Sequence, residues 1–186
     1  MSDIKGRRAQ AFAALLRAVN LGSRNRVPMA ELRALAERLG AEDVRTYVQS
    51  GNVVFRSSQA ADVLAAELHE AIQERFGLDI AVVVRTGAQL AKIAARNPFA
   101  GPGVEDRTLH VAFLAETPSR ARIRELDPGF AAPDVLRVVG RHVYLHYPNG
   151  YGRTKLTNTV LERRLGVAAT TRNWRTVTAL AELTTR

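Results

Sequence analysis

The spacing of apolar residues predicts an alternation of short strands and helices from the start of the chain. Residues 10–19 are almost all apolar, which predicts a largely buried strand. An apolar stripe at helical spacing follows Pro28, a residue that suits the first turn of a helix. The stripe ends before Gly40, which suits a left-handed position after the helix. We therefore expect a strand and then a helix.

The pattern then predicts two strands, a helix and a fourth strand. Residues 44–48 and 52–56 have the composition of strands and are joined by a tight turn at Ser50-Gly51. An unbroken i, i+4 apolar stripe over residues 64–76 predicts the second helix, and β-branched residues dominate 80–84. The resulting order, βαββαβ, is that of a ferredoxin-like unit.

The second half repeats this order. A short helix near residues 88–95 leads to a stretch rich in proline and glycine at 97–103, which is the best candidate for a boundary. The later elements are a strand at 109–114, a helix begun by Thr117-Pro118, a hairpin of 135–139 and 142–147, a helix at 156–165, a short strand at 167–170 and a final helix at 174–183.

We therefore predict an α+β fold of two tandem ferredoxin-like βαββαβ units, residues 1–97 and 104–186, that form one compact protein. The two halves show no obvious repeat of individual residues. The duplication is inferred from the order of the elements alone.

The composition is that of an ordinary globular protein, with 46% apolar and 24% charged residues. No run approaches the ~20 apolar residues that a membrane span requires. The apolar stretch near the N-terminus is interrupted by Arg17 and has no cleavage site after it, so we expect a short leader rather than a signal peptide. The absence of cysteine excludes disulfides, thiolate catalysis and cysteine-ligated metals. We expect a soluble, cytoplasmic protein.

The net charge of +9 points to an anionic partner, such as a phosphate-bearing small molecule or nucleic acid. Codon bias is a stronger explanation of this positive charge. Of the 27 basic residues all but three are arginine, and alanine is also abundant, as GC-rich codons would produce. No run of five basic residues occurs either.

The common catalytic motifs are absent. The sequence contains no P-loop, dinucleotide-binding glycine motif, nucleophile elbow or zinc-protease helix. His142 and His146 would lie about 13 Å apart on the predicted strand, at ~3.3 Å per residue, which is too far for one metal ion. The paired carboxylates Glu42-Asp43 and Glu105-Asp106 point in different directions. We expect no metal and no cofactor.

Three polar segments instead lie beside predicted strand ends and helix starts. Arg17 is notable among them because an unpaired charge inside an apolar strand is costly to bury. The candidate ligand-binding residues in these segments are Arg17, Asn20, Gly22, Gln49, Ser50, Gly51, Asn52, Lys155, Asn158, Thr171, Arg172, Asn173 and Trp174.

Each segment also has a structural explanation. Asparagine and glycine permit turns, and Ser50-Gly51-Asn52 closes a hairpin. Thr171 or Asn173 caps the last helix, and Trp174 packs in the core.

The same segments carry a family resemblance. The motifs R-x-x-N-x-G (17–22), T-Y-x-Q-S-G-N (46–52), K-L-T-N (155–158) and T-R-N-W (171–174) are similar in kind and order to those of the domain-of-unknown-function 1697 family. The resemblance extends from about Phe12 to the C-terminus, with Ala18 and Ser23 where glycines are expected. It implies a bacterial, intracellular protein of ferredoxin-like α+β build, and it implies no activity.

Three hypotheses follow. In the first, arginine and lysine side chains and a helix N-terminus bind a phosphate-bearing ligand, either a nucleotide or nucleic acid. In the second, the same residues form an enzyme in which Lys155 or Arg172 stabilises an anion and Ser50 or Thr171 is the nucleophile, but the motifs contain no general base. In the third, they form a buried hydrogen-bond network that joins the two halves.

Solvent access separates the first hypothesis from the third. One form of the first hypothesis, in which RNA bases stack on aromatic side chains of a sheet face, is less favoured. Tyr47 and Tyr144 are the only clear strand tyrosines, and Phe55 is expected in the core.

Overall fold

The first half of the chain folds as a four-stranded sheet with two helices. The computed structural model describes residues 8–20, 25–127 and 129–185. The sheet order is β2-β3-β1-β4, all antiparallel, which is the ferredoxin-like arrangement. Its elements are β1 (Gln10–Leu16), α1 (Met29–Arg38), β2 (Glu42–Tyr47), β3 (Asn52–Ser57), α2 (Ala61–Phe76) and β4 (Val82–Thr86).

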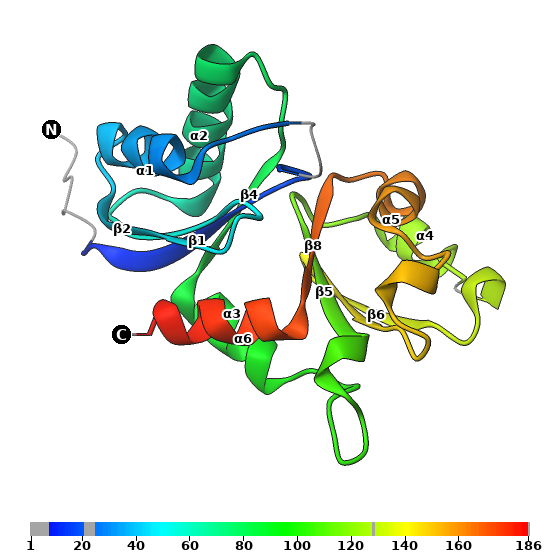
Figure 1. Cartoon of the computed structure of the whole chain (residues 1–186). Helices are drawn as coiled ribbons and strands as arrows, with labels where there is room; N and C mark the ends of the chain where they lie inside the picture. The colour runs from blue at the N-terminus through cyan, green and yellow to red at the C-terminus, as the bar shows by residue number, and fades with distance from the viewer. Residues whose placement is uncertain (1–7, 21–24, 128, 186) are drawn as a thin grey trace, which may run out of the picture. The chain divides into compact units, whose positions relative to one another are not determined.

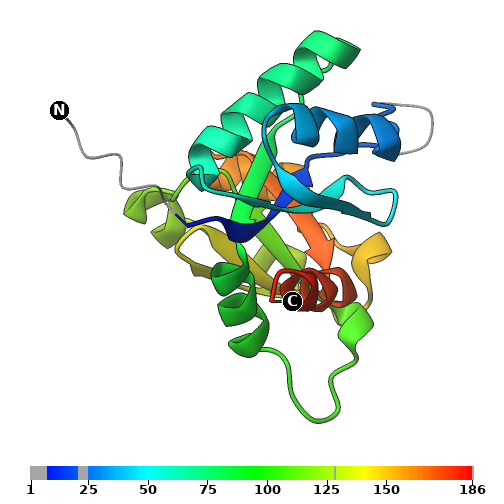
Figure 2. The same cartoon turned by 90° about the vertical axis from the view of Figure 1, so that its left-hand side faces the viewer.

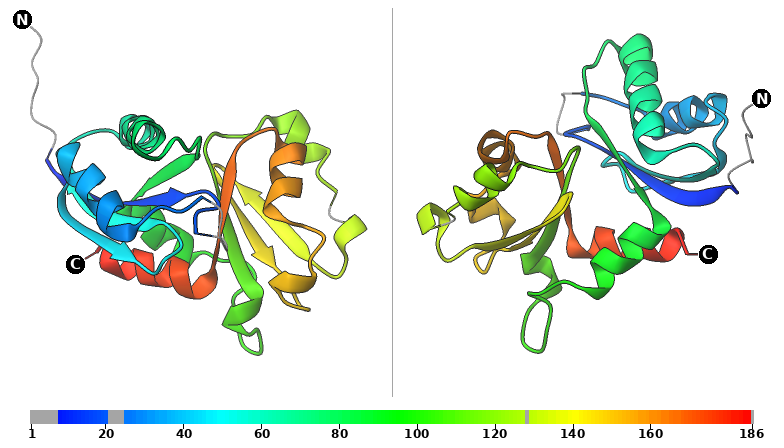
Figure 3. Two further views of the ribbon diagram at one scale, coloured as in Figure 1. Left: turned by 45° about the horizontal axis from the view of Figure 1, so that its top comes forward. Right: turned by 180° about the vertical axis from the view of Figure 1, so that it is seen from behind.

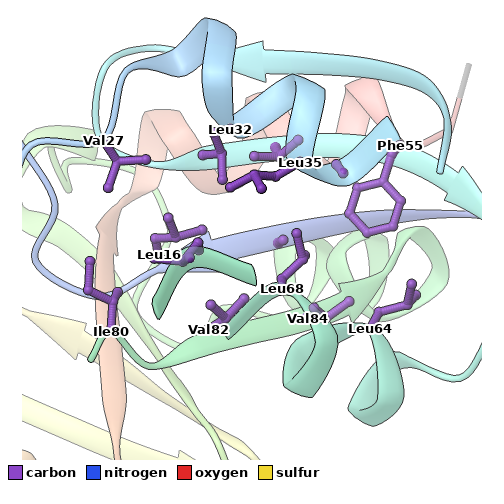
Figure 4. Packing of buried hydrophobic residues seen from close by; sticks show 14 of the residues in the cluster. Leu16, Val27, Leu32, Leu35, Phe55, Leu64, Leu68, Ile80, Val82 and Val84 are labelled. Atoms are coloured by element: carbon purple, nitrogen blue, oxygen red, sulfur yellow. The ribbon is translucent and has the colours of Figure 1, made fainter. Parts of the chain in front are cut away.

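Both helices cover the same face of this sheet (Figures 1 and 2). Successive side chains of β1 alternate between the two faces, so Phe12 and Leu16 point towards the helices and pack in their core. Leu32 of α1 and Leu68 of α2 lie in this core together with Leu16 (Figure 4). Gly77 ends α2 in the left-handed conformation, with φ 66°.

The second half has the same topology, with sheet order β6-β7-β5-β8. Two helices, α4 and α5, lie together on one face of this sheet (Figure 3). Helix α3 (Gly87–Ala95) follows β4 directly, and helix α6 (Trp174–Leu183) follows β8 directly. The remaining elements are β5 (Leu109–Leu114), α4 (Arg120–Arg124), β6 (Val135–Val139), β7 (His142–His146), α5 (Asn158–Leu165) and β8 (Ala169–Asn173).

The chain divides into two compact units. The first unit extends to Ala91 and includes the segment from Leu180, and the second unit comprises Lys92–Ala179. The division therefore falls inside α3 and inside α6. Within the first unit the start of α3 contacts the end of α6, because a Cβ added to Gly87 would lie 2.7 Å from the carbonyl oxygen of Thr184. The predicted boundary at residues 97–103 lies in the segment between α3 and β5.

Backbone hydrogen bonds extend the predicted duplication to individual positions, which the sequence does not show. In the first unit Leu16 N donates to Gly51 O, and Arg17 N donates to Ala81 O, both at 2.9 Å. In the second unit Leu114 N donates to Arg141 O at 2.9 Å, and Ala115 N donates to Ala168 O at 2.8 Å. These bonds match the end of β1 to the end of β5, position by position.

The strand register extends this match across both sheets. Arg85 pairs with Ala13, and Arg172 pairs with Val111, so the two arginines occupy equivalent positions. By the same register His110 is equivalent to Phe12. The two units are thus repeats of one topology with one pairing register, and a few positions also keep the same residue.

Most predicted elements are confirmed, but three strands have other bounds and two further local details differ. β1 ends at Leu16, β4 spans Val82–Thr86 and β8 spans Ala169–Asn173, whereas the sequence predicted 10–19, 80–84 and 167–170. Arg17 therefore lies after β1 and not inside the strand. The turn between β2 and β3 has four residues, Val48–Gly51, because Tyr47 pairs with Asn52, whereas a tighter turn was predicted. Helix α4 begins after the predicted Thr117-Pro118, because the hydroxyl of Ser119 accepts a hydrogen bond from Arg122 N at 3.2 Å and caps the helix there.

Candidate functional site

The first predicted motif lies in the loop after β1, and Asn20 holds that loop together. Its Nδ2 donates to Val27 O at 3.0 Å and to Gln49 O at 2.8 Å, while its Oδ1 accepts from Val27 N at 2.9 Å. Asn20 has φ 55°, a left-handed conformation that asparagine tolerates well. Arg17, half-buried, is just before it. Gly22 lies outside the described residues.

We expect the substitution Asn20→Ala to lower the free energy of unfolding by about 2–3 kcal/mol, since each internal hydrogen bond contributes roughly 1 kcal/mol net. Urea denaturation at neutral pH measures this change. Asn25→Ala is the matched control, because Asn25 also has a positive φ (48°) and donates a single side-chain bond, to Ala18 O at 3.1 Å. Equal losses in the two variants would show that the Asn20 amide does not hold the loop to the hairpin.

The second motif forms the β2–β3 turn, and its buried members also make internal bonds. Asn52 is completely buried, and its Nδ2 donates to Tyr47 O at 3.1 Å and to Ser50 Oγ at 2.9 Å. Gly51 is buried too, and packs against Leu16 at the end of β1 and Val19 after it. The side chain of Gln49 is exposed, although its carbonyl accepts the bond from Asn20. This motif therefore shapes the turn and presents Gln49 to solvent.

The third motif ties the start of α5 to β8 in the second unit. Thr171 Oγ1 donates to Asn158 Oδ1 at 2.8 Å, and Asn158 Nδ2 donates to Ala169 O at 2.9 Å. Thr157 caps the helix, since its hydroxyl accepts from Val160 N at 3.3 Å. Lys155 is exposed and stands just before this fixed turn.

Arg172 lies on the opposite face of β8 from Thr171, because successive side chains of a strand alternate. It is 8% exposed, and its guanidinium donates from Nη1 to Thr170 Oγ1 at 2.7 Å and to Thr171 O at 3.0 Å. Burial lowers the pKa of Arg172 to about 10. The structure therefore does not bring Arg172 together with Asn158 on one face of the sheet.

The last two predicted residues lie at the start of α6. Asn173 caps this helix, because its Oδ1 accepts from Thr176 N at 2.9 Å, and the rest of its side chain is exposed. Trp174 is buried. Most of the described members of the predicted set thus make internal bonds or packing contacts, and Gln49, Lys155 and Asn173 are its exposed members.

An aromatic cluster in the second unit lies outside the sequence motifs. The ring of His110 lies 5.1 Å from the ring of Tyr147 and 5.2 Å from that of Tyr151, between centroids. His110 is 7% exposed, and its Nδ1 has no hydrogen-bond partner among the described residues. Burial lowers its pKa, and the backbone of Thr108 opposes this effect. His110 stands alone in the sequence of its strand, so only the three-dimensional arrangement links it to the tyrosines.

The segment after β7 that carries Tyr151 and Lys155 is fixed by hydrogen bonds. Tyr147, fully buried, donates from its hydroxyl to Leu156 O at 3.0 Å. Thr154 Oγ1 donates to the buried carboxylate of Asp134 and accepts from Leu156 N at 2.8 Å. Burial raises the pKa of Tyr147, and the Tyr151 and Asp134 side chains raise it further, so its hydroxyl stays protonated as a donor.

The remaining histidines do not form a metal site. His142 and His146 are half-buried on β7, as predicted. In residues 8–20, 25–127 and 129–185, no cluster of three or more histidine or carboxylate side chains is arranged to hold a metal ion. Nor does the described part of the chain contain a helix long and apolar enough to cross a membrane.

Comparison with known proteins identifies the family and the fold. The family described as "Protein of unknown function (DUF1697)" matches residues 10–144, a range that contains the first two motifs and ends before Lys155. The chain is similar to the conserved bacterial protein SP0830 from Streptococcus pneumoniae, with a TM-score of 0.71 and 21% identity over 94% of this chain and 98% of that one. At this identity the likeness concerns the fold alone, and no curated protein matches the chain. Because the family match covers more than half of the 186 residues, the chain belongs to the DUF1697 family.

Proposed function

We propose that the protein binds a phosphate-bearing ligand, a nucleotide, at the surface of the second unit, with Lys155 as its charged contact. The observation that carries this proposal is the contrast between Lys155 and its neighbours. Thr154, Leu156 and Asn158 are all committed to internal hydrogen bonds, while Lys155 between them is exposed. A cation held on a rigid segment loses less conformational entropy on binding an anion than one on a mobile loop.

The start of α5 supports the same proposal. The first N–H groups of a helix have no acceptor within the helix, and they carry a partial positive charge. Here the Thr157 hydroxyl accepts from Val160 N. Asn158 and Thr159 occupy the first two helical positions, whose N–H groups have no acceptor within the helix. A phosphate beside Lys155 would meet these groups as well. The net charge of +9 favours an anion in general.

A structural role is favoured for other members of the predicted set. The side chains of Asn20, Asn52 and Arg172 donate hydrogen bonds to groups of their own unit, and Asn52 and Arg172 are buried. We therefore divide the predicted residues into a scaffold, which these three represent, and a smaller group that contacts the ligand. The proposal places the protein in the cytoplasm, where free nucleotides occur.

Isothermal titration with ATP tests the proposal. We expect Lys155→Ala to weaken ATP binding roughly 10- to 100-fold, because a hydrogen bond to a charged group contributes about 1.5–3 kcal/mol. Lys92→Ala is the matched control, since Lys92 is an exposed lysine of the same unit outside the predicted set. The affinity of the unmodified protein should also fall as salt is raised. Equal affinities for the two variants, or no binding of ATP or inorganic phosphate by the unmodified protein, would reject the proposal.

A further inference from the structure

The exposed ring of Tyr151 rests on two other rings. Tyr151 begins a 3-10 turn, Tyr151–Arg153, that follows β7, and it is 46% exposed. Its ring is nearly parallel to that of His110, with 5.2 Å between centroids and 23° between planes. It meets Tyr147 edge-on, at 5.7 Å and 63°. One side of Tyr151 is therefore packed against aromatic rings, while the rest of the ring faces solvent.

The support beneath Tyr151 is rigid. Tyr147 is fully buried and its hydroxyl is bonded to the Leu156 carbonyl, while His110 is 7% exposed. The backbone enters the turn through Gly150, whose φ of 83° is a conformation that favours glycine. The turn and the two buried rings thus hold Tyr151 in one orientation. An aromatic surface fixed in this way can stack with a planar ligand without first being ordered.

The repeat between the two units shows that the fold does not require this cluster. The position of His110 is held by Phe12 in the first unit, and the position of Tyr147 is held by Ser57. Phe12 is completely buried and stacks with Phe55 inside the core, at 5.9 Å between centroids. The ferredoxin-like sheet is thus complete with an ordinary apolar core at this position. The histidine and the exposed tyrosine are particular to the second unit.

We propose that Tyr151 is the stacking platform for the base of a mononucleotide, whose phosphate is bound at Lys155. This inference rests on the proposed function and adds to it the contact for the base and the restriction to a mononucleotide. Every nucleobase has a flat π-face, and stacking on an aromatic side chain needs no particular hydrogen-bond pattern. Lys155 follows Tyr151 by four residues on the same fixed segment, so one segment supplies an aromatic contact and a cationic contact.

A mononucleotide fits better than a nucleic-acid strand. Proteins that bind single strands present a series of aromatic side chains to successive bases. Among the described residues, Tyr151 and Phe130 are the exposed aromatic side chains, at 46% and 39%. The guanidinium of Arg164 lies over the ring of Phe130, 4.1 Å from its centroid, so that face is already covered. A single open platform holds a single base.

Isothermal titration of the full chain with AMP and with ribose 5-phosphate tests the inference, because the two ligands share the phosphate and differ in the base. We expect the unmodified protein to bind AMP at least roughly tenfold more tightly, in line with stacking on one aromatic side chain. Tyr151→Ala should remove this preference and leave the affinity for ribose 5-phosphate within about twofold. Tyr151→Phe, which keeps the ring, should preserve the preference, and Phe130→Ala should change neither affinity.

The outcomes separate this inference from the proposed function. Equal affinities of the unmodified protein for AMP and ribose 5-phosphate would refute the platform and leave the phosphate site standing. Binding of neither ligand would refute both. A preference for AMP that survives in Tyr151→Ala, or in Tyr151→Leu if the alanine variant does not fold, would place the base elsewhere. An unstructured oligoadenylate that binds more than tenfold more tightly than AMP, with a steep dependence on salt, would show that the ligand is a nucleic acid instead.

Discussion

Replacing Gly51 with alanine should lower the free energy of unfolding by about 2–5 kcal/mol, the sum of a backbone cost and a packing cost. Gly51 has φ 73°, where a residue with a Cβ is strained by roughly 1–2 kcal/mol. A Cβ would also lie 2.4 Å from Cγ2 of Val19 and 2.9 Å from Cβ of Leu16. Both neighbours are buried, so neither side chain can move freely aside. Urea denaturation followed by circular dichroism measures the loss.

Gly40→Ala separates the two contributions. Gly40 also has a positive φ, of 82°, but nothing lies within 4 Å of its added Cβ. This variant should therefore show the backbone cost alone, about 1–2 kcal/mol. If both variants lose the same free energy, Val19 and Leu16 accommodate the methyl group without cost. A larger loss at Gly51 would show that this glycine of the family motif is needed for packing between the hairpin and the end of β1.

The elements that the sequence predicted well are those defined by local patterns. β5 was predicted at its observed bounds, because a mostly apolar run of strand length lies between Thr108 and Glu116. The end of α2 at Gly77 was equally readable, since a glycine after an apolar stripe favours a left-handed stop. Periodicity and capping act over a few residues, and a sequence shows them directly.

Strand register is a long-range property, and there the sequence was insufficient. The equivalence of Arg85 with Arg172 depends on each arginine's partner in β1 or β5, and neither partner is near it in the chain. The stacking of His110 beneath Tyr151 likewise joins residues far apart in sequence. A histidine in an apolar strand looks the same whether it is core or part of a site. Only pairing and burial distinguish the two.

The candidate residues were found as motifs, but their division into scaffold and ligand contacts was not predictable. Lys155 and Asn158 belong to one four-residue motif, yet Lys155 is exposed while Asn158 bonds to Thr171 and Ala169. A motif reports that residues occur together, and it does not report which side chains are already hydrogen-bonded. That distinction depends on where β8 passes relative to the start of α5.

Arg172→Ala should lower the free energy of unfolding by about 2–4 kcal/mol in ligand-free buffer, through a cavity and lost hydrogen bonds. Arg85→Ala is the matched control. Arg85 is 3% exposed and occupies the equivalent position in the first unit. Each arginine donates from Nη1 to the carbonyl oxygen of the residue before it, Arg85 to Val84 at 2.9 Å and Arg172 to Thr171 at 3.0 Å. We expect the two variants to agree within about 1 kcal/mol. Chemical denaturation of both proteins, under identical conditions, makes the comparison.

Comparing the Arg172→Ala and Arg85→Ala variants shows whether Arg172 has a structural role or contacts the ligand. Arg172 is buried and donates to Thr170 Oγ1 and Thr171 O, so the surrounding structure holds its guanidinium in place, although burial lowers the pKa of this group to about 10. Its position across β8 from Thr171 also separates it from a phosphate bound beside Asn158. If Arg172→Ala kept full stability and lost ATP binding, while Arg85→Ala kept both, Arg172 would belong to the ligand site. Matched losses of stability, with ATP affinity unchanged in the folded fraction, would mean that each repeat needs a buried arginine on its last strand.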